Sequence, residues 1–344
     1  MLNVIIALLI FGFLILIHEL GHYTMARVFK VGINEFSVGM GPKVVSKKSK
    51  KTGIAYSLRL LPIGGFVSMD GEDEDSGSEN SLSSKPVWQR FFIMVAGAVM
   101  NILVGIVLTC VIVCCSQALG STVVASFSEN ASSQTAGLAE GDRIVKIGKH
   151  GVHTSYDLSY IIMHSATEKT DITVIRGGET VVIPGVEFKT ETESGVTVAM
   201  RDFRVKAERK SFGNVVKHSF WQSLTSVRMI WDSLIDLVTG KYGVDALSGP
   251  IGITGEIGNA VAAHDGGMNL MYLTAFIALS LGIFNLLPFP ALDGGQIVLL
   301  IVELIIGKPV KREIAGYINF VGLALLMLLM LFVTYQDITR LIKK

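Results

Sequence analysis

Cysteine and charge are both scarce in this sequence, and each shortage excludes a class of protein. The chain has three cysteines, Cys110, Cys114 and Cys115, which share one apolar run and lie too close together for a disulfide framework. Charged residues make up 17% of the chain and the formal net charge is +1, so no overall field favours nucleic acid or an acidic partner. Half of the 344 residues are hydrophobic, and the mean hydropathy is +0.53. This composition predicts a membrane part with room for one soluble module.

The first apolar run lacks the basic residues with which a secretory signal peptide begins. Residues 2–17 are apolar almost without interruption, and no charged residue precedes them. The run leads directly into the polar motif of residues 18–22. We therefore expect residues 3–26 to form a membrane helix that is not cleaved off.

Three further apolar runs are long enough to cross a bilayer, at residues 91–118, 271–305 and 316–336. Pro288 and Pro290 interrupt the third run, and proline breaks a helix because it has no backbone N–H to donate. The sequence therefore predicts a polytopic α-helical membrane protein with four transmembrane helices.

Positive charge is distributed unevenly between the segments that connect these runs. Lysines and arginines cluster in residues 27–90 and again at Lys308, Lys311 and Arg312. Because cytoplasmic loops of membrane proteins carry an excess of these residues, we expect both segments in the cytoplasm and both chain termini outside. The acidic, Ser/Gly-rich stretch at residues 72–78 is expected to be a solvated loop.

The segment between the second and third runs has α+β character. Residues 136–147 have the pattern of a turn followed by a strand, and residues 156–164 have that of a helix. Residues 171–184 have the pattern of two strands around Gly177 and Gly178, which can adopt the positive φ of a tight turn. The sequence therefore predicts a small soluble module here.

Residues 211–240 have the periodicity of an amphipathic helix. Arg228, Asp232 and Asp236 interrupt the pattern too often for a membrane-spanning helix. Two placements stay open, one at the membrane surface and one packed against the membrane bundle. The apolar positions at 3–4 spacing are Phe220, Leu224, Val227, Trp231, Leu234 and Val238.

A His-Glu-x-x-His motif stands at residues 18–22, near the end of the first predicted membrane helix. His18 and His22 share one helix face about one turn apart, as two ligands of one zinc ion must. Glu19 is rotated by about 100° from His18 and would take a proton from a water molecule activated by the metal. Ionisable residues at this depth are costly without a purpose, so a zinc protease centre is favoured over interfacial histidines.

The third ligand is expected from the interrupted third run. A catalytic zinc needs three protein ligands and one open position, and broken backbone within a bilayer is tolerated where it is buried in protein or lines a cavity. Asp293 follows the two prolines and precedes Gly294 and Gly295, which allow close approach. We therefore predict Asp293 as the third ligand, with Glu256 and Glu303 as rivals.

Together these two motifs resemble the site-2 protease family of intramembrane zinc metalloproteases, and most closely its bacterial branch that cleaves anti-sigma factors. The resemblance rests on residues 18–22 and on residues 285–295, and it covers nearly the whole chain. Residues 54–69 have strand-like alternation, and residues 62–67 together with Gly71 and Glu72 are similar to a membrane-associated β-hairpin of that branch. Residues 248–252 are similar to its segment before the third helix.

The second helix shows one departure from the family pattern. Ala96 and Gly97 are followed by Ala98, where the family usually has a proline. The resemblance also implies the division of the chain. It comprises an N-terminal membrane core (residues 1–120), a single PDZ domain (121–203), an amphipathic helix with linker (204–255) and a C-terminal membrane core (256–344).

The activity implied by the resemblance is that of a zinc metalloendopeptidase. It would cut single-span membrane proteins, such as anti-sigma factors or remnant signal peptides, after they have been trimmed outside the cell membrane. Asn285 would hold the substrate backbone or the oxyanion, and the hairpin at Gly65 and Phe66 would hold a substrate strand. The PDZ domain would take a newly exposed C-terminus. The resemblance places the protein in the bacterial cytoplasmic membrane, with the PDZ domain outside and the active site near the cytoplasmic side.

Two other classes of function were weighed against proteolysis. A membrane scaffold that collects partners through a PDZ domain has no use for Glu19. A metal transporter would need charged residues along a path through the other helices, and the sequence has one compact site instead. Both alternatives are therefore disfavoured.

Overall fold

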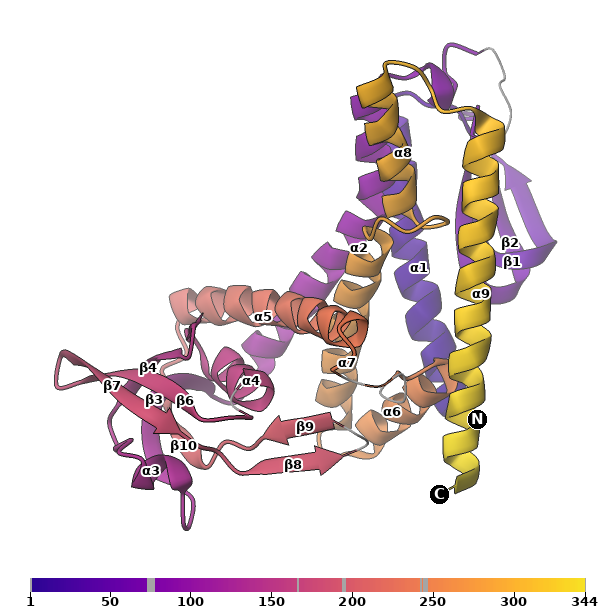
Figure 1. Cartoon of the computed structure of the whole chain (residues 1–344). Coiled ribbons are helices and arrows are strands. Elements are labelled where there is room, and N and C mark those ends of the chain that lie inside the picture. The colour runs from indigo at the N-terminus through magenta and orange to yellow at the C-terminus, as the bar shows by residue number, and fades with distance from the viewer. Residues whose placement is uncertain are drawn as a thin grey trace. The chain divides into compact units, whose positions relative to one another are not determined.

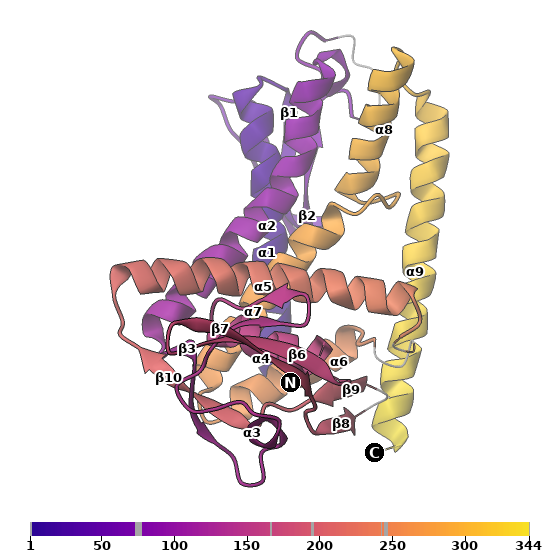
Figure 2. The ribbon, with the colours of Figure 1, turned by 60° about the vertical axis from the view of Figure 1, so that its left-hand side comes forward.

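The computed structural model of the chain describes residues 2–72, 78–165, 167–193, 196–241, 243 and 247–343. They form two compact units, which Figures 1 and 2 show from two sides. The first unit consists of residues 1–105 and 248–344, and the second consists of residues 106–247. The second unit is therefore an insertion into the first.

Four helices in the described part of the chain are long and apolar enough to cross a membrane, as predicted. They are α1 (Leu2–Val28), α2 (Val87–Cys115), α7 (Gly266–Asn285) and α9 (Arg312–Lys343). Small residues lie where they pack closely, because a side chain there would keep the backbones apart. A methyl group on Gly105 of α2 would lie 2.6 Å from Leu279 of α7, and one on Gly282 would lie 2.8 Å from the Ala98 carbonyl.

The third apolar run is divided between two helices. α7 ends at Asn285, and α8 (Asp293–Ile306) begins beyond the two prolines. Ala291, in the connecting turn, adopts the left-handed conformation with φ of 72°, which is uncommon for a residue with a side chain. The predicted break is present, and α8 is too short to span a bilayer by itself.

A β-sheet follows α1 in the first unit. Strands β1 (Ile33–Lys48) and β2 (Ala55–Met69) pair with each other, and the helical turn η1 (Leu82–Ser84) follows. Residues 35–38 pair with residues 55–58 on one side and with residues 65–68 on the other, so the two strands fold back on each other. The sheet is therefore larger than the predicted hairpin. Its core with α1 and α2 consists of Ala26, Val31, Ile33, Ile54, Val67, Met69, Leu82 and Ile93.

Strand β1 has no clear signal in the sequence, because lysines interrupt its alternation. Its bend occurs at Gly39 and Gly41, whose φ values are 86° and 85° and suit glycine alone. The predicted acidic loop at residues 72–78 falls largely outside the described residues, which omit 73–77.

Helix α6 (Pro250–Ala262) begins in the 248–252 segment that resembles the family. Asp337 of α9 is 3% exposed, and its carboxylate accepts hydrogen bonds from the backbone N–H groups of Gly249 (3.2 Å) and Gly252 (2.8 Å). Gly249, the N-cap, offers no side chain of its own. The two glycines therefore let α9 supply the cap of α6.

The second unit contains the predicted α+β module. Its main sheet has the strand order β10-β3-β4-β6-β7, with β5 paired to β4, and a second sheet pairs β8 with β9. The predicted helix and the predicted hairpin are both present, as α4 and as β6 with β7. The elements are β3 (Leu119–Phe127), α3 (Ser132–Thr135), β4 (Arg143–Ile147), β5 (His150–Gly151), α4 (Ser155–Ser165), β6 (Thr170–Arg176), β7 (Glu179–Val186), β8 (Thr190–Glu193), β9 (Val196–Ala199) and β10 (Phe203–Glu208).

A buried carboxylate joins the start of β4 to β6. Asp142 is 1% exposed and accepts two hydrogen bonds of 2.7 Å from the Arg176 guanidinium. Burial alone would raise the pKa of Asp142, but these hydrogen bonds outweigh it and hold the pKa below its usual range.

Helix α5 (Phe212–Val238) turns its polar side toward its own unit and its apolar side outward. Asp232 accepts a 2.6 Å hydrogen bond from the Tyr160 hydroxyl of α4, and Asp236 lies 2.7 Å from His164 Nε2. These pairs explain the charges that interrupt the amphipathic pattern. The exposed apolar residues are Phe212, Val216, Phe220, Leu224, Trp231, Ile235 and Val238. Both predicted placements of this face, at the membrane surface and against the membrane bundle, stay open.

Candidate metal centre

Helix α1 presents both histidines of the predicted motif on one face. It continues without interruption from Leu2 to Val28, so the α-helical repeat puts His18 and His22 about one turn apart. Their Nε2 atoms lie 3.1 Å from each other. His22 is buried, with 7% of its surface exposed, which separates its imidazole from bulk water.

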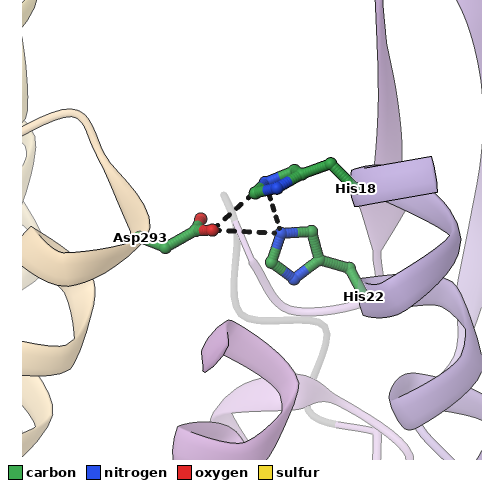
Figure 3. Close-up of side chains that lie close together, drawn as sticks. All are labelled: His18, His22 and Asp293. Atoms are coloured by element: carbon green, nitrogen blue, oxygen red, sulfur yellow. Dashed lines mark hydrogen bonds and ion pairs between the residues drawn. The ribbon is translucent and has the colours of Figure 1, made fainter. Parts of the chain in front are cut away.

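Asp293 completes a cluster of three possible ligands. It is the first residue of α8, and its Oδ2 atom lies 3.1 Å from His18 Nε2 and 3.4 Å from His22 Nε2 (Figure 3). Within the described part of the chain, these side chains form the only group of three or more metal-ligating residues. The structure therefore brings together the two motifs that the sequence places far apart.

The hydrogen bonding of the cluster calls for a cation. His22 Nδ1 lies 2.8 Å from the Ile93 carbonyl and must donate to it, which in the neutral imidazole, the form that binds metal, leaves Nε2 as an acceptor. Asp293 Oδ2 is also an acceptor; this atom is buried, and the two imidazole Nε2 atoms lie beside it at ion-pair distance. Converging buried acceptors repel each other unless a positive charge lies between them.

The residues fit zinc in chemistry and in spacing. Two imidazole nitrogens and one carboxylate oxygen are a common ligand set of catalytic zinc. Tetrahedral ligands at about 2.0–2.2 Å from the ion are roughly 3.3–3.6 Å apart. The three separations, 3.1, 3.1 and 3.4 Å, are close to this value.

The backbone of α2 supports the two imidazoles, a feature that the sequence analysis did not identify. A methyl group on Gly97 would overlap with His22 Nε2 and would lie 2.7 Å from His18 Cε1. A methyl group on Gly21 of α1 would overlap with the Ala96 carbonyl. The two glycines therefore let the histidines lie directly on α2, and the Ala-Gly pair in the second apolar run is the signal for it.

Glu19 lies beside the cluster and next to β2. It is half-buried. Gly65 of β2 is buried, and a methyl group there would lie 3.4 Å from Glu19 Cγ and 2.9 Å from the Ser37 carbonyl. The structure thus places one residue of the predicted substrate-holding hairpin against the predicted base.

Phe66 and Asn285 are the other predicted substrate-binding residues. The Phe66 ring lies 4.8 Å beneath the Arg59 guanidinium, which itself pairs with Glu35 at 2.9 Å. Asn285 is the last residue of α7 and is half-buried. Substrate contact at either residue stays a prediction.

The rival ligands lie outside the cluster. Glu303 pairs with Arg90, each side chain being 15% exposed, and this pair joins α8 to the start of α2. Glu256 is exposed on α6. The geometry therefore favours Asp293 over both. The Arg90–Glu303 pair was not predicted, although an arginine at the edge of one apolar run and a glutamate within another are its signal.

The whole chain is similar to known metalloproteases. Residues 6–329 match the model of peptidase family M50. A relative from Clostridium acetobutylicum is 36% identical over 98% of this chain and 97% of its own length. The regulator of sigma-W protease RasP of Bacillus subtilis is 31% identical, and the zinc metalloprotease RasP of Bacillus licheniformis is 30% identical; each match covers 98% of this chain and 99% of the relative.

Proposed function

The chain belongs to peptidase family M50, the site-2 protease family, and we propose that it is an intramembrane zinc metalloprotease with its ion held by His18, His22 and Asp293. The observation that carries the ligand assignment is the convergence of these three side chains at zinc-ligand spacing. Two of them are on a helix long and apolar enough to span a membrane. A scaffold protein would gain nothing from this arrangement.

The residues of the centre would have different roles in peptide hydrolysis. Bound zinc supplies Lewis acidity, which polarises a carbonyl and makes water nucleophilic near neutral pH. Glu19 would take a proton from the attacking water and return it to the leaving amine. His22 holds its orientation through the Ile93 carbonyl.

The substrate must reach this centre as an extended strand. A transmembrane helix pairs its own carbonyls, so a segment has to unwind before it can be attacked. We propose that β2 near Gly65 and Phe66 holds the unwound segment by strand addition, because Gly65 adjoins Glu19. Asn285 would contact the substrate backbone or the oxyanion.

We propose single-span membrane proteins as substrates. The Bacillus subtilis relative is named a regulator of sigma-W protease. Anti-sigma factors and remnant signal peptides, both already trimmed outside the membrane, are the classes that fit. Residues 121–203 would act as a PDZ domain that takes the newly exposed C-terminus.

One experiment tests cleavage and the role of the module together. The purified enzyme should cut a single-span anti-sigma factor trimmed to a free outer C-terminus, and it should spare the untrimmed form. Deleting residues 125–203 should extend cleavage to the untrimmed form. The deletion joins Val124 to Arg204, which is the neighbour of Val205, and Val205 pairs with Val124 across β3 and β10. The two chain ends therefore lie close together.

Each part of this experiment has an outcome that would contradict the proposal it tests. No cleavage of the trimmed substrate by zinc-loaded wild-type enzyme would contradict the proposed substrate class. An unchanged substrate range in the deletion variant, with the trimmed substrate still cut, would reject the module as a filter.

The proposed topology puts β1 and β2 on the cytoplasmic side and the module outside, in a bacterial cytoplasmic membrane. It rests on the lysines of the first loop. In a variant without Cys110, Cys114 and Cys115, an impermeant thiol reagent added from outside should label His150→Cys and spare Lys48→Cys. Both positions should react after the membrane is opened. The reverse pattern in intact cells would overturn the orientation.

A further inference from the structure

Helix α9 is exposed along most of its length, apart from three points. Its buried positions, among those with described side chains, are Gly322, Val333 and Asp337. Asp337 caps α6, and a methyl group on Gly249 would lie 3.0 Å from Val333. Gly322 is different, because its neighbour is the turn between α7 and α8. Figures 1 and 2 both show this turn extending toward α9.

Gly322 is in direct contact with Pro290. A methyl group on Gly322 would overlap with Pro290 Cβ, and it would lie 2.5 Å from the Pro290 carbonyl oxygen and 2.6 Å from the carbonyl carbon. Two of these three atoms are backbone, so they cannot move aside as a flexible side chain would. The turn can therefore lie against α9 only because Gly322 has no side chain.

Asn319, three residues before Gly322 on α9, contacts the same connecting turn. Its Oδ1 atom accepts a hydrogen bond of 3.4 Å from the backbone N–H of Ala291, which has the left-handed φ of 72°. Pro288 and Pro290, which precede Ala291, have no backbone N–H. The Ala291 N–H is therefore one of few hydrogen-bond donors in the turn. Asn319 is half-buried on a helix that is otherwise largely exposed.

The turn determines where Asp293 lies. The N-cap of α8 is Leu292, whose side chain cannot hydrogen-bond, so no side-chain cap fixes the start of this helix. Methyl groups on Gly294 and Gly295 would overlap with the Leu287 and Phe289 carbonyls, so the start of α8 is in tight contact with the turn that precedes it. A displacement at Pro290 and Ala291 is therefore transmitted to Asp293 rather than absorbed.

We propose that Gly322 and Asn319 are positioning residues for the metal centre, holding the Pro290–Ala291 turn so that Asp293 meets the two histidines. This inference rests on the proposed zinc assignment. It gives the last membrane helix a part in metal binding, although its sequence contains no metal ligand. Groups that orient metal ligands typically account for about 10–100-fold in metal affinity, and we expect a loss in that range here.

The test is zinc affinity of the purified full chain, stripped of metal and titrated against a competing chromophoric chelator. Gly322→Ala and Asn319→Leu should bind zinc about 10–100-fold more weakly than wild type. Gly316→Ala is the matched control, because a methyl group there has nothing within 4 Å. Phe320→Leu, at a residue that is 70% exposed, is the control for Asn319. Both controls should retain wild-type affinity.

A merely structural role would change the thermal stability of the metal-free variants and leave the metal site as it is. The absorption bands of Co²⁺ bound in place of zinc report ligand geometry, and they should shift in Gly322→Ala but not in Gly316→Ala. Equal zinc affinity and equal cobalt spectra in these two variants would overturn the inference. If Gly322→Ala does not fold, Asn319→Leu against Phe320→Leu decides it by the same two readouts.

Asp293→Ala in the same titration separates this inference from the proposed function. If Asp293→Ala keeps wild-type zinc affinity, the ligand assignment itself is wrong. If it loses zinc while Gly322→Ala and Asn319→Leu keep theirs, the assignment stands and only the role of α9 is rejected.

Discussion

Glu19→Gln is expected to fold, bind one zinc ion per chain and leave its substrate uncut. The three converging ligand atoms come from His18, His22 and Asp293, so Glu19 is not needed to hold the metal. Glutamine has nearly the same shape as glutamate but cannot accept a proton. General acid–base catalysis contributes roughly 10²–10⁴-fold in rate, and Glu19 is proposed to act on both the water and the leaving amine. The loss in kcat should therefore reach at least the upper part of that range.

The measurement uses purified enzyme in detergent with a trimmed single-span substrate, and zinc is determined on the same sample. Substrate binding should persist, so Glu19→Gln should pull down uncut substrate from membranes. Cleavage near the wild-type rate by a zinc-loaded Glu19→Gln variant would refute the proton-transfer role.

Asp293→Ala is expected to lose both zinc and activity. Among the described residues, its Oδ2 atom is the one carboxylate oxygen within 3.4 Å of both imidazoles. Without it, two histidines remain from one helix, and the loss in affinity should exceed the roughly 10–100-fold that orienting residues contribute. Zinc content after dialysis against a weak chelator should fall well below one ion per chain.

Glu303→Gln is the matched control on the same helix. Glu303 is also a carboxylate of α8, but it pairs with Arg90 rather than with the histidines. It should keep its zinc, although the join between α8 and α2 is weakened. Loss of zinc in Glu303→Gln together with retention in Asp293→Ala would make Glu303 the ligand instead.

Features of the site that depend on local spacing could be predicted from the sequence. His18 and His22 are four residues apart on an apolar stretch, and the helical repeat alone brings them together. The break before Asp293 follows from two prolines. Asp293 could be named, but Glu256 and Glu303 could not be excluded, because the sequence does not show which carboxylate faces α1.

Features that depend on contact between distant segments could not be predicted. Gly97 supports the imidazoles only because α1 crosses α2 at that point, whereas the close neighbours of Gly105 and Gly322 are Leu279 and Pro290 rather than histidines. Strand β1 forms despite its lysines, because residues 35–38 have a partner on each side. Charged residues interrupt the amphipathic pattern of α5, and the sequence does not show that Asp232 and Asp236 have partners on α4.

Similarity to known metalloproteases supports the activity of the protein, but it does not test the individual residues of the site. Membership of peptidase family M50 confirms the resemblance to site-2 proteases and, with it, zinc-dependent proteolysis. The boundaries of the PDZ domain, the orientation in the membrane and the substrate contacts stay predictions, each tied to a residue that can be changed.

The insertion of the second unit has a consequence for biosynthesis. The histidines are in residues 1–105, whereas Asp293 and the α9 residues that support its turn follow residue 248. The first two membrane helices and the whole module are therefore synthesised before Asp293, the proposed third ligand. A nascent or prematurely terminated chain would have two of the three proposed ligands, and we expect it not to cut the membrane proteins being inserted beside it. Proteolytic capacity is expected only once the segment after residue 248 is in place.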